Sequence, residues 1–284
     1  SASDTGTFTI TVTGSNDGPV ATFDADQFAT EDGDSISGQL TSTDVDVLGQ
    51  TASYALDGPA IAGLTIGSTG AWFFDPSDEA YQSLAAGETQ IVTVNYSVTD
   101  DQDASDAGSF TITVSGSNNA AVITGTSTGS VTEDGVLLTA SGSLSVSDDD
   151  TDESAFAEVA TADLIGSYGT WSFDSSSGAW SYLLANASTA VQELSEGETV
   201  TDTLTVESVD GSASEIITVT ITGRNDAAVI TGDTTGAVVE DGTLTASGTL
   251  AVSDVDTDEG SFESTSDLTG TYGSFTFNPV TGAW

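Results

Sequence analysis

The sequence has no cysteine, histidine, lysine or methionine, and Arg224 is its single basic side chain. Without cysteine, the chain forms no disulfide bonds and offers no thiolate to a metal. The absence of both cysteine and histidine also disfavours zinc and copper. Nucleic acids and anionic membrane surfaces attract lysine and arginine, so neither is an expected partner. No apolar run approaches the roughly 18 residues of a membrane span, and no charged and then apolar leader segment is found.

Acidic residues, by contrast, are abundant in the sequence. It carries 45 aspartates and glutamates, for a net charge of −44 over 284 residues. Hydrophobic residues make up 37% of the chain, which is enough to build cores and argues against a disordered acidic tail. A compact body of this charge repels itself. Cations are therefore the expected partners.

One stretch of the sequence occurs three times in similar form. It reads Phe-Thr-Ile-Thr-Val-Thr-Gly-Ser-Asn-Asp at residues 8–17, and it returns at residues 110–119 and 217–226. Each copy is followed, in the same order, by Glu-Asp-Gly, Asp-Xaa-Asp and Gly-Ala-Trp. The turns begin at Glu31, Glu133 and Glu240; the pairs are Asp44/Asp46, Asp148/Asp150 and Asp254/Asp256; the tryptophans are Trp72, Trp180 and Trp284. Four markers in a fixed order indicate tandem repeats of about 100 residues.

The spacing of these markers predicts the domain organisation. Residues 1–16 are expected to be the closing strand of a preceding repeat. Residues 17–118 and 119–225 are expected to be complete repeats, and residues 226–284 the first part of a further one. By this interpretation the parent array is longer than the chain.

Within a repeat the pattern is that of β-strands. Residues 110–114 alternate apolar side chains with threonine, as in a strand with one buried and one solvent face. Residues 171–182 and 275–284 read as β-hairpins, and no segment shows a helical period. Short strands and frequent turns in roughly 100 residues predict an all-β fold of tandem immunoglobulin-like sandwiches with seven strands. Trp72 and Trp180 are expected in the cores.

The acidic residues of one repeat are separated by a strand. Residues 35–43 span roughly 30 Å in extended form, at about 3.3 Å per residue. Glu31 and Asp44 are therefore expected at opposite ends of one domain. Across a linker, by contrast, the glutamate of one repeat can meet the Asp-Xaa-Asp pair of the next.

The sequence accordingly predicts cation sites at the linkers. A hard cation takes six to eight oxygen ligands, which carboxylates, asparagine amides and backbone carbonyls supply. An isolated Asp-Xaa-Asp pair is common in so acidic a chain, and it is the regular register that singles these out. The first site comprises Asn16, Asp17, Asp44 and Asp46; the second Glu31, Asn118, Asn119, Asp148 and Asp150; the third Glu133, Asn225, Asp226, Asp254 and Asp256; Glu240 is the corresponding glutamate of the last repeat.

The residues around the first linker resemble a known pattern. Asn-Asp-Gly-Pro-Val at residues 16–20, then Glu31, then Asp44-Val-Asp46 resembles the linker, the first-strand glutamate and the Asp-Xaa-Asp motif of cadherins. The closer resemblance, over essentially the whole chain, is to the VCBS and bacterial cadherin-like repeats of giant repeats-in-toxin adhesins. It implies cadherin-like β-sandwiches in extracellular arrays, Ca²⁺ at the junctions, type I secretion, and a role in attachment or biofilm formation.

The sequence departs from this pattern in two respects. Asn119 stands where the other linkers have aspartate, which removes a negative charge from that site. The acidic motif that cadherins carry in the middle of a domain has no clear match, and Asp75, Asp78 and Glu79 are weak candidates in one repeat. Further candidate ligands lie in hairpins near a domain end: Asp100, Asp101, Asp103 and Asp210.

These expectations combine into one predicted function and two alternatives. The chain is predicted to be a calcium-stiffened extender segment of a secreted bacterial cell-surface adhesin, projecting a distal adhesion domain. One alternative is a subunit of a self-assembling extracellular filament or surface layer, because extension and assembly use the same domains. The other is a carbohydrate- or ice-binding module, which needs an exposed aromatic or threonine-rich face.

An enzyme is not expected. Without histidine, cysteine and lysine, only carboxylates could act as acid and base, as in glycoside hydrolysis. Such a pair needs one raised pKa in an enclosed cleft. The acidic residues here fall mainly in repeated turns and linkers instead.

Overall fold

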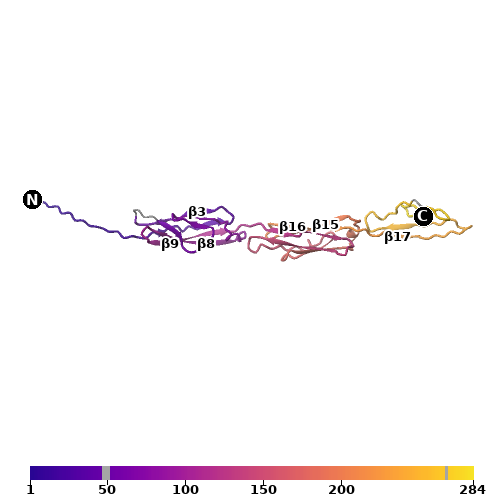
Figure 1. The fold of residues 1–284 in the computed structure, drawn as a ribbon, viewed down its shortest axis with the longest axis horizontal. Coiled ribbons are helices and arrows are strands. Elements are labelled where there is room, and N and C mark those ends of the chain that lie inside the picture. Colours follow the sequence, from indigo (N-terminus) through magenta and orange to yellow (C-terminus); the bar gives the residue numbers. More distant parts are fainter. Residues whose placement is uncertain (47–51, 266–267) are drawn as a thin grey trace. The chain divides into compact units, whose positions relative to one another are not determined.

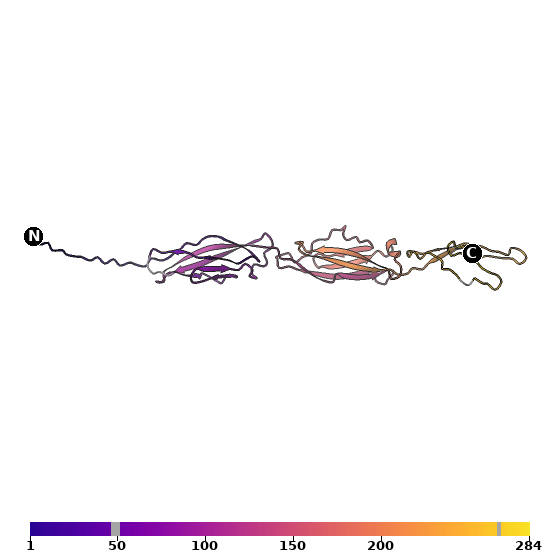
Figure 2. The ribbon, with the colours of Figure 1, turned by 90° about the horizontal axis from the view of Figure 1, so that it is seen from above.

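The chain divides into two compact units. The structure, a computed structural model, describes residues 1–46, 52–265 and 268–284. The first unit consists of Ser1–Ala120 together with Asp148–Glu153, and the second of Ala121–Ser147 together with Ser154–Trp284. Within each unit the strands run side by side, as Figures 1 and 2 show.

The first unit contains a β-sandwich. Its two main sheets have the strand orders β2-β9-β8-β5 and β3-β7-β6, and β1 pairs with β4. The β2–β9 pair is parallel, and the other pairs are antiparallel. The strands are β1 (Val20–Ala21), β2 (Gln27–Thr30), β3 (Ile36–Gln39), β4 (Ser42–Thr43), β5 (Ser53–Leu56), β6 (Leu64–Ile66), β7 (Ala71–Phe74), β8 (Thr89–Thr99) and β9 (Ser105–Ser115).

The second unit contains a sandwich of the predicted seven strands. One sheet has the order β10-β12-β14-β13 and the other β11-β16-β15, and the β11–β16 pair is again parallel. The strands are β10 (Val122–Gly125), β11 (Thr128–Thr132), β12 (Thr139–Ser147), β13 (Gly169–Phe173), β14 (Ala179–Leu184), β15 (Thr199–Glu207) and β16 (Ser214–Thr222). The hairpin predicted at residues 171–182 is formed by β13 and β14, with Phe173 opposite Trp180.

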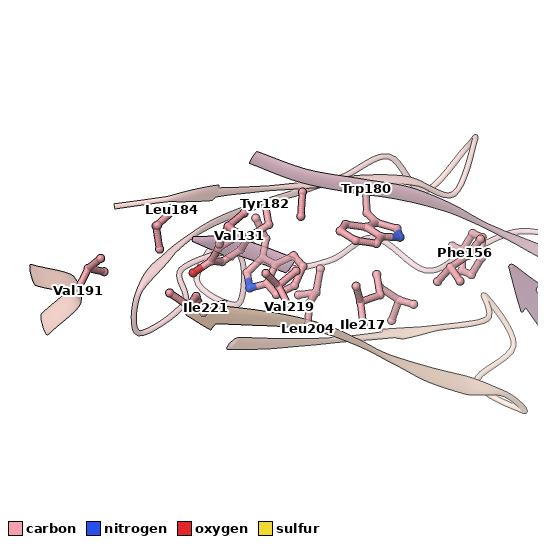
Figure 3. Close-up of a cluster of buried hydrophobic side chains, with 14 of the residues drawn as sticks. Val131, Phe156, Trp180, Tyr182, Leu184, Val191, Leu204, Ile217, Val219 and Ile221 are labelled. Atoms are coloured by element: carbon pink, nitrogen blue, oxygen red, sulfur yellow. The ribbon is translucent and has the colours of Figure 1, made fainter. Parts of the chain in front are cut away.

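The cores lie between the sheets, as the alternation of apolar and polar residues along the strands predicts. Trp72 and Trp180 are each 2% exposed, and residues 110, 112 and 114 of β9 are buried, so the predicted core is confirmed. In Figure 3 the Trp180 and Tyr182 side chains point from one sheet towards Leu204, Ile217 and Val219 on the other. Burying an aromatic side chain removes a large apolar area from water, which is what holds the two sheets together.

In each repeat the tryptophan ring packs against a glycine of a neighbouring segment. A Cβ added to Gly142 would lie 2.7 Å from the Trp180 ring, and one added to Gly38 would lie 2.6 Å from the Trp72 ring. The indole therefore lies flat against the backbone at these positions. The same contact joins Gly248 to Trp284.

One element differs from the sequence prediction. The structure has a short helix, α1 (Thr189–Gln192), where no helical period was recognised. A four-residue helix is one turn long, so no 3.6-residue period can show in its sequence. The matching segment of the first unit, residues 78–84, forms turns.

Two other predicted elements are not formed as strands. Residues 8–12 are extended, exposed and outside any strand. Of the hairpin predicted at residues 275–284 the turn is formed, and its last two residues pair with residues 248–249 through an isolated bridge and backbone hydrogen bonds. Strands need neighbours to supply their backbone hydrogen bonds, and a lone hairpin is marginal in water. The strand pair that is formed in this region joins β17 (Val229–Gly232) to β18 (Leu250–Ser253).

Among the described residues, no helix is both long enough and apolar enough to cross a membrane.

Candidate cation sites

The first carboxylate cluster lies at one end of the first sandwich. It comprises Glu31, Asn119, Asp148, Asp150 and Glu153. Because β2 and β9 are parallel, Glu31 and the residues that follow β9 emerge at the same end of the sheet, and the Glu31 amide donates to the Ser115 carbonyl at 3.0 Å. The loop Asp148–Glu153 belongs to the same compact unit.

Backbone amides orient the carboxylates of this cluster. The Asn119 amide donates to Asp150 Oδ2 at 2.8 Å, and the Asp150 amide donates to Asp148 Oδ1 at 2.9 Å. The Ser117 amide donates to Glu31 Oε1 at 3.3 Å. These bonds bring together residues from three separate stretches of the sequence.

Two oxygens of the first cluster are buried without a hydrogen-bond partner. Glu31 is 1% exposed and Asp150 2% exposed, and Glu31 Oε2 and Asp150 Oδ1 accept no hydrogen bond. Carboxylate oxygens of Asp148, Asp150 and Glu153 lie within 4.8 Å of one another. Burying a carboxylate is costly unless it is paired or binds a metal. An all-oxygen set of this kind fits a hard divalent cation such as Ca²⁺.

The surroundings raise the pKa of Glu31 above its usual value. Burial is the main cause, and the nearby charges of Asp150 and Asp32 add to it, while the Ser117 amide acts in the opposite direction. A raised carboxyl pKa means that the folded protein disfavours the charged form. A cation would reverse that preference.

The second carboxylate cluster repeats the arrangement in the second unit. It comprises Glu133, Asp226, Asp254 and Asp256. The Asp226 amide donates to Asp256 Oδ2 at 2.8 Å, and the Asp256 amide donates to Asp254 Oδ1 at 3.1 Å. Asp256 Oδ1 and Asp226 Oδ2 are buried without a hydrogen-bond partner.

Glu133 of this cluster is fully shielded from solvent. Its Oε1 accepts from Gln192 Nε2 at 2.8 Å, and its Oε2 accepts from the Arg224 amide at 3.2 Å. Burial is again the first cause that raises its pKa, followed by the negative charges of Asp226, Asp134 and Asp256. The pKa of Asp226 is raised as well, by burial and then by Asp134 and Asp256.

The first predicted site is partly assembled. The Asp17 amide donates to Asp46 Oδ2 at 2.7 Å, and the Asp46 amide donates to Asp44 Oδ1 at 2.9 Å. Asn16 Nδ2 donates to the buried Asp100 at 2.9 Å, and this bond is the first cause that lowers the pKa of Asp100. Asp100 thus lies beside the linker asparagine.

The remaining candidates lie apart from these groups or at their margins. Asp101 and Asp103 are exposed in the β8–β9 turn, and Glu240 is exposed in its Glu-Asp-Gly turn. Asp210 is half-buried in the β15–β16 turn. Two linker asparagines, Asn118 and Asn225, donate their side-chain amides to the carbonyl of the next residue.

Sequence reasoning missed a threonine and a glutamate in the acidic loop. Thr151 donates from both its amide (3.1 Å) and its Oγ1 (2.7 Å) to the Ser83 carbonyl, and Thr257 does the same to the Glu193 carbonyl at 3.2 and 2.9 Å. Glu153 contributes a third carboxylate beside the aspartate pair. A longer motif could have revealed both, because Asp-Xaa-Asp-Thr-Asp-Glu occurs at residues 148–153 and 254–259.

Two family models match the chain. Residues 16–113 match the bacterial Ig domain and residues 118–223 match the bacterial cadherin-like domain. Each match covers one predicted complete repeat almost entirely. No curated protein matches the chain at a significant level.

Solved cadherin structures match the chain at low identity and with TM-scores below 0.5. Protocadherin gamma B2 extracellular domains 1–5 match with 16% identity and a TM-score of 0.45, covering 94% of this chain and 52% of that one. Mouse cadherin-23 domains EC22–24 match with 12% identity and a TM-score of 0.46, covering 95% and 87%. Human protocadherin-24 EC1–2 matches with 14% identity and a TM-score of 0.38, covering 75% and 100%. The chain spans about half the length of the first of these structures.

Proposed function

Because this chain carries cadherin-like, immunoglobulin-like repeats, we propose that it is a calcium-stiffened extender segment of a bacterial cell-surface adhesin. In this role the repeats hold a distal adhesion domain away from the cell, in attachment or biofilm formation. The parent protein would be secreted and the array would work outside the cell, where calcium is plentiful. Its partners are calcium ions and neighbouring repeats of the same chain.

One observation carries the proposal. Buried carboxylate oxygens without a hydrogen-bond partner occur in both clusters, at Glu31 and Asp150 in one and at Asp226 and Asp256 in the other, and Asp150 and Asp256 hold the same position of the Asp-Xaa-Asp motif. The sequence has one basic side chain, so lysine and arginine side chains cannot neutralise these carboxylates. A divalent cation supplies the missing charge and accepts several oxygens at once.

The proposed mechanism is electrostatic. Without calcium the clustered carboxylates repel one another, and contacts between domains are small enough to permit hinge motion. Each bound ion adds two positive charges where the carboxylates converge. The ion removes the repulsion and ties the linker to the acidic loop, so the angle between domains becomes fixed.

Small-angle scattering on the whole chain tests the proposal. We expect a larger maximum dimension in calcium than in chelator, with unchanged circular dichroism because each sandwich stays folded. Isothermal titration should detect binding at about 10⁻⁴–10⁻³ M, the range of extracellular calcium modules. An unchanged maximum dimension would mean that calcium is not the stiffener.

A double variant separates the site from general charge effects. Asp148→Ala with Asp150→Ala should remain flexible at one linker even in calcium. Asp57→Ala with Asp163→Ala removes the same charge from exposed positions outside the candidate sites and should behave like the wild type. If both variants stiffen equally, the assignment of the site residues is wrong.

The filament or surface-layer alternative predicts a different observable. Lateral or end-to-end assembly makes the molar mass rise with protein concentration in calcium, whereas an extender alone stays monomeric. Light scattering over a range of concentrations distinguishes the two.

A specific feature supports the carbohydrate- or ice-binding alternative. The solvent face of β11-β16-β15 presents three rows of three hydroxyl side chains, placed opposite one another by the strand register. The rows are Thr128–Thr218–Thr203, Ser130–Thr220–Thr201 and Thr132–Thr222–Thr199. Binding to insoluble polysaccharides or to ice that Thr201→Asp and Thr220→Asp abolish would favour this function. Trp72, Trp171 and Trp180, by contrast, are buried and unavailable to stack on a sugar.

A further inference from the structure

A glutamine outside the acidic motifs contacts the buried glutamate of the second cluster. Gln192 is the last residue of α1, and its Nε2 donates to Glu133 Oε1 at 2.8 Å. The other carboxylate oxygen of Glu133 accepts the Arg224 amide at 3.2 Å. Two directional donors from different segments therefore fix the plane of a carboxylate that is fully shielded from water.

The residue after this glutamine holds the other half of the cluster. The Glu193 carbonyl accepts both the amide and the Oγ1 of Thr257, at 3.2 and 2.9 Å. Thr257 directly follows Asp256, whose Oδ1 is one of the buried unpartnered oxygens. Two consecutive residues thus set the position of Glu133 and of the aspartate loop.

The first unit has a turn at the matching place. Tyr-Gln-Ser-Leu at residues 81–84 corresponds to Val-Gln-Glu-Leu at residues 191–194, and the Ser83 carbonyl accepts the same two bonds from Thr151, at 3.1 and 2.7 Å. Here Gln82 Nε2 is buried without a hydrogen-bond partner, as is Glu31 Oε2. Leaving a buried donor unpaired is costly. The side-chain amide of Gln82 is therefore available to donate a hydrogen bond at this end of the sandwich.

We propose that Gln192, and Gln82 at the matching place, are positioning residues of the two cation sites. The Gln192 side-chain amide orients Glu133 so that its carboxylate presents a fixed edge to the cation. Gln82, whose carbonyl accepts from Asn119 of the first cluster, offers the matching donor there. The inference rests on the proposed function, because it assigns a role within the same sites. Groups that hydrogen-bond to a metal-ligating side chain set its orientation, and losing one weakens metal affinity by roughly 10–100-fold.

A calcium titration of the whole chain, read site by site, tests this role. The Asp226 and Asn119 amides each donate to an aspartate of one cluster, so their NMR signals report the two sites separately. Gln192→Leu should weaken calcium binding at the second cluster by roughly 10–100-fold and leave the first unchanged. Gln82→Leu should do the reverse. Gln90→Leu, at an exposed position of β8, should change neither.

The outcomes separate this inference from the proposed function. If the wild type binds calcium and Gln192→Leu binds it equally well, the positioning role is overturned and the extender proposal stands. Equal weakening at both clusters would point to a general loss of stability and would also overturn it. No calcium binding by the wild type at either cluster would overturn both.

Discussion

At the scale of single residues, buried carboxylates divide into those with full sets of partners and those without. Asp202 of β15 is buried in the second sandwich, yet it accepts from the Ser167 amide (2.9 Å), the Tyr168 amide (2.9 Å) and the Tyr182 hydroxyl (2.7 Å). The first sandwich has Val92 at the matching place in its register. Asp202 therefore anchors a loop to the core, whereas Glu31, Asp150, Asp226 and Asp256 each keep one buried oxygen without a hydrogen-bond partner.

The Tyr182–Asp202 bond predicts an alkaline loss of stability. Burial, and then the bond to Asp202, raises the pKa of Tyr182. The folded state therefore holds the phenol proton more tightly than the unfolded chain, so this stability is complete below about pH 10 and is lost as the pH rises further. Tyr182→Phe should cost about 1.5–3 kcal/mol at neutral pH, because it removes a bond to a charged group, and it should flatten the alkaline decline.

Urea unfolding followed by tryptophan fluorescence, in a Trp72→Phe background, reports on the second unit. A variant that loses as much stability as the wild type between about pH 9 and 11 would show that Tyr182 does not carry the effect. Tyr96, whose pKa is also raised by burial, lies in the other sandwich and does not enter this signal.

Glu31 predicts the same relation between charge and stability in a lower pH range. Its raised pKa means that the folded, ion-free protein binds the proton more tightly than the unfolded chain. The associated stability is present at low pH and declines as the pH rises above about 4.3. In chelator at pH 7, Glu31→Gln should therefore melt at a higher temperature than the wild type, and the difference should vanish as the pH falls.

Calcium should reverse the order of the melting temperatures of the wild type and Glu31→Gln, because only the wild type has the carboxylate that the ion needs. Differential scanning calorimetry in chelator and in calcium measures both effects. A Glu31→Gln protein that is less stable than the wild type in chelator at pH 7 would contradict the interpretation of Glu31 as a buried charge that destabilises the ion-free protein.

At the scale of elements, each sandwich depends on a close approach between two strands. β12 can lie against Trp180 of β14 only because Gly142 has no side chain. Gly142→Ala should destabilise the second unit by about 1–3 kcal/mol, the usual cost of overpacking, even though alanine ordinarily favours a strand more than glycine. Denaturant unfolding measures this cost.

A matched substitution controls for the change in backbone entropy. Gly14→Ala places its Cβ in open space and should leave the unfolding transition of the second unit where it is. If Gly142→Ala is as stable as the wild type, the tryptophan can shift and the glycine contact does not define the packing.

At the scale of the whole molecule, the net charge of −44 makes stability depend on ions. In chelator, raising the salt concentration to about 1 M shortens the screening length to roughly 3 Å, so the melting temperature should rise. Calcium should add about 2.7 kcal/mol per site at 100 times its dissociation constant, which is more than screening alone provides.

Calorimetry at matched ionic strength, with sodium chloride in one series and calcium chloride in the other, distinguishes binding from screening. Equal melting temperatures in the two series would mean that calcium acts only as a counterion. With calcium saturating, the dependence on sodium chloride should become shallower, because the most closely spaced carboxylates are then neutralised.

The sequence by itself determined the repeat, the all-β fold and the core. Strict alternation at residues 110–114 sorts side chains to two faces of a strand whatever lies nearby, so the buried set could be read directly. The register of Glu31 and Asp148/Asp150 around a linker followed from strand length alone. These properties depend on neighbouring residues and on spacing along the chain, so they can be predicted from the sequence.

The tertiary structure decided which groups meet and which oxygens remain unpaired. Glu31 lies at the end of the sheet that carries the linker because β2 pairs in parallel with β9. Gln192 donates to Glu133, a bond between residues distant in the chain that no period or spacing in the sequence encodes. The burial that leaves Glu31 Oε2 and Asp150 Oδ1 without donors exists only once the segments are packed, because solvent access is a property of the folded surface.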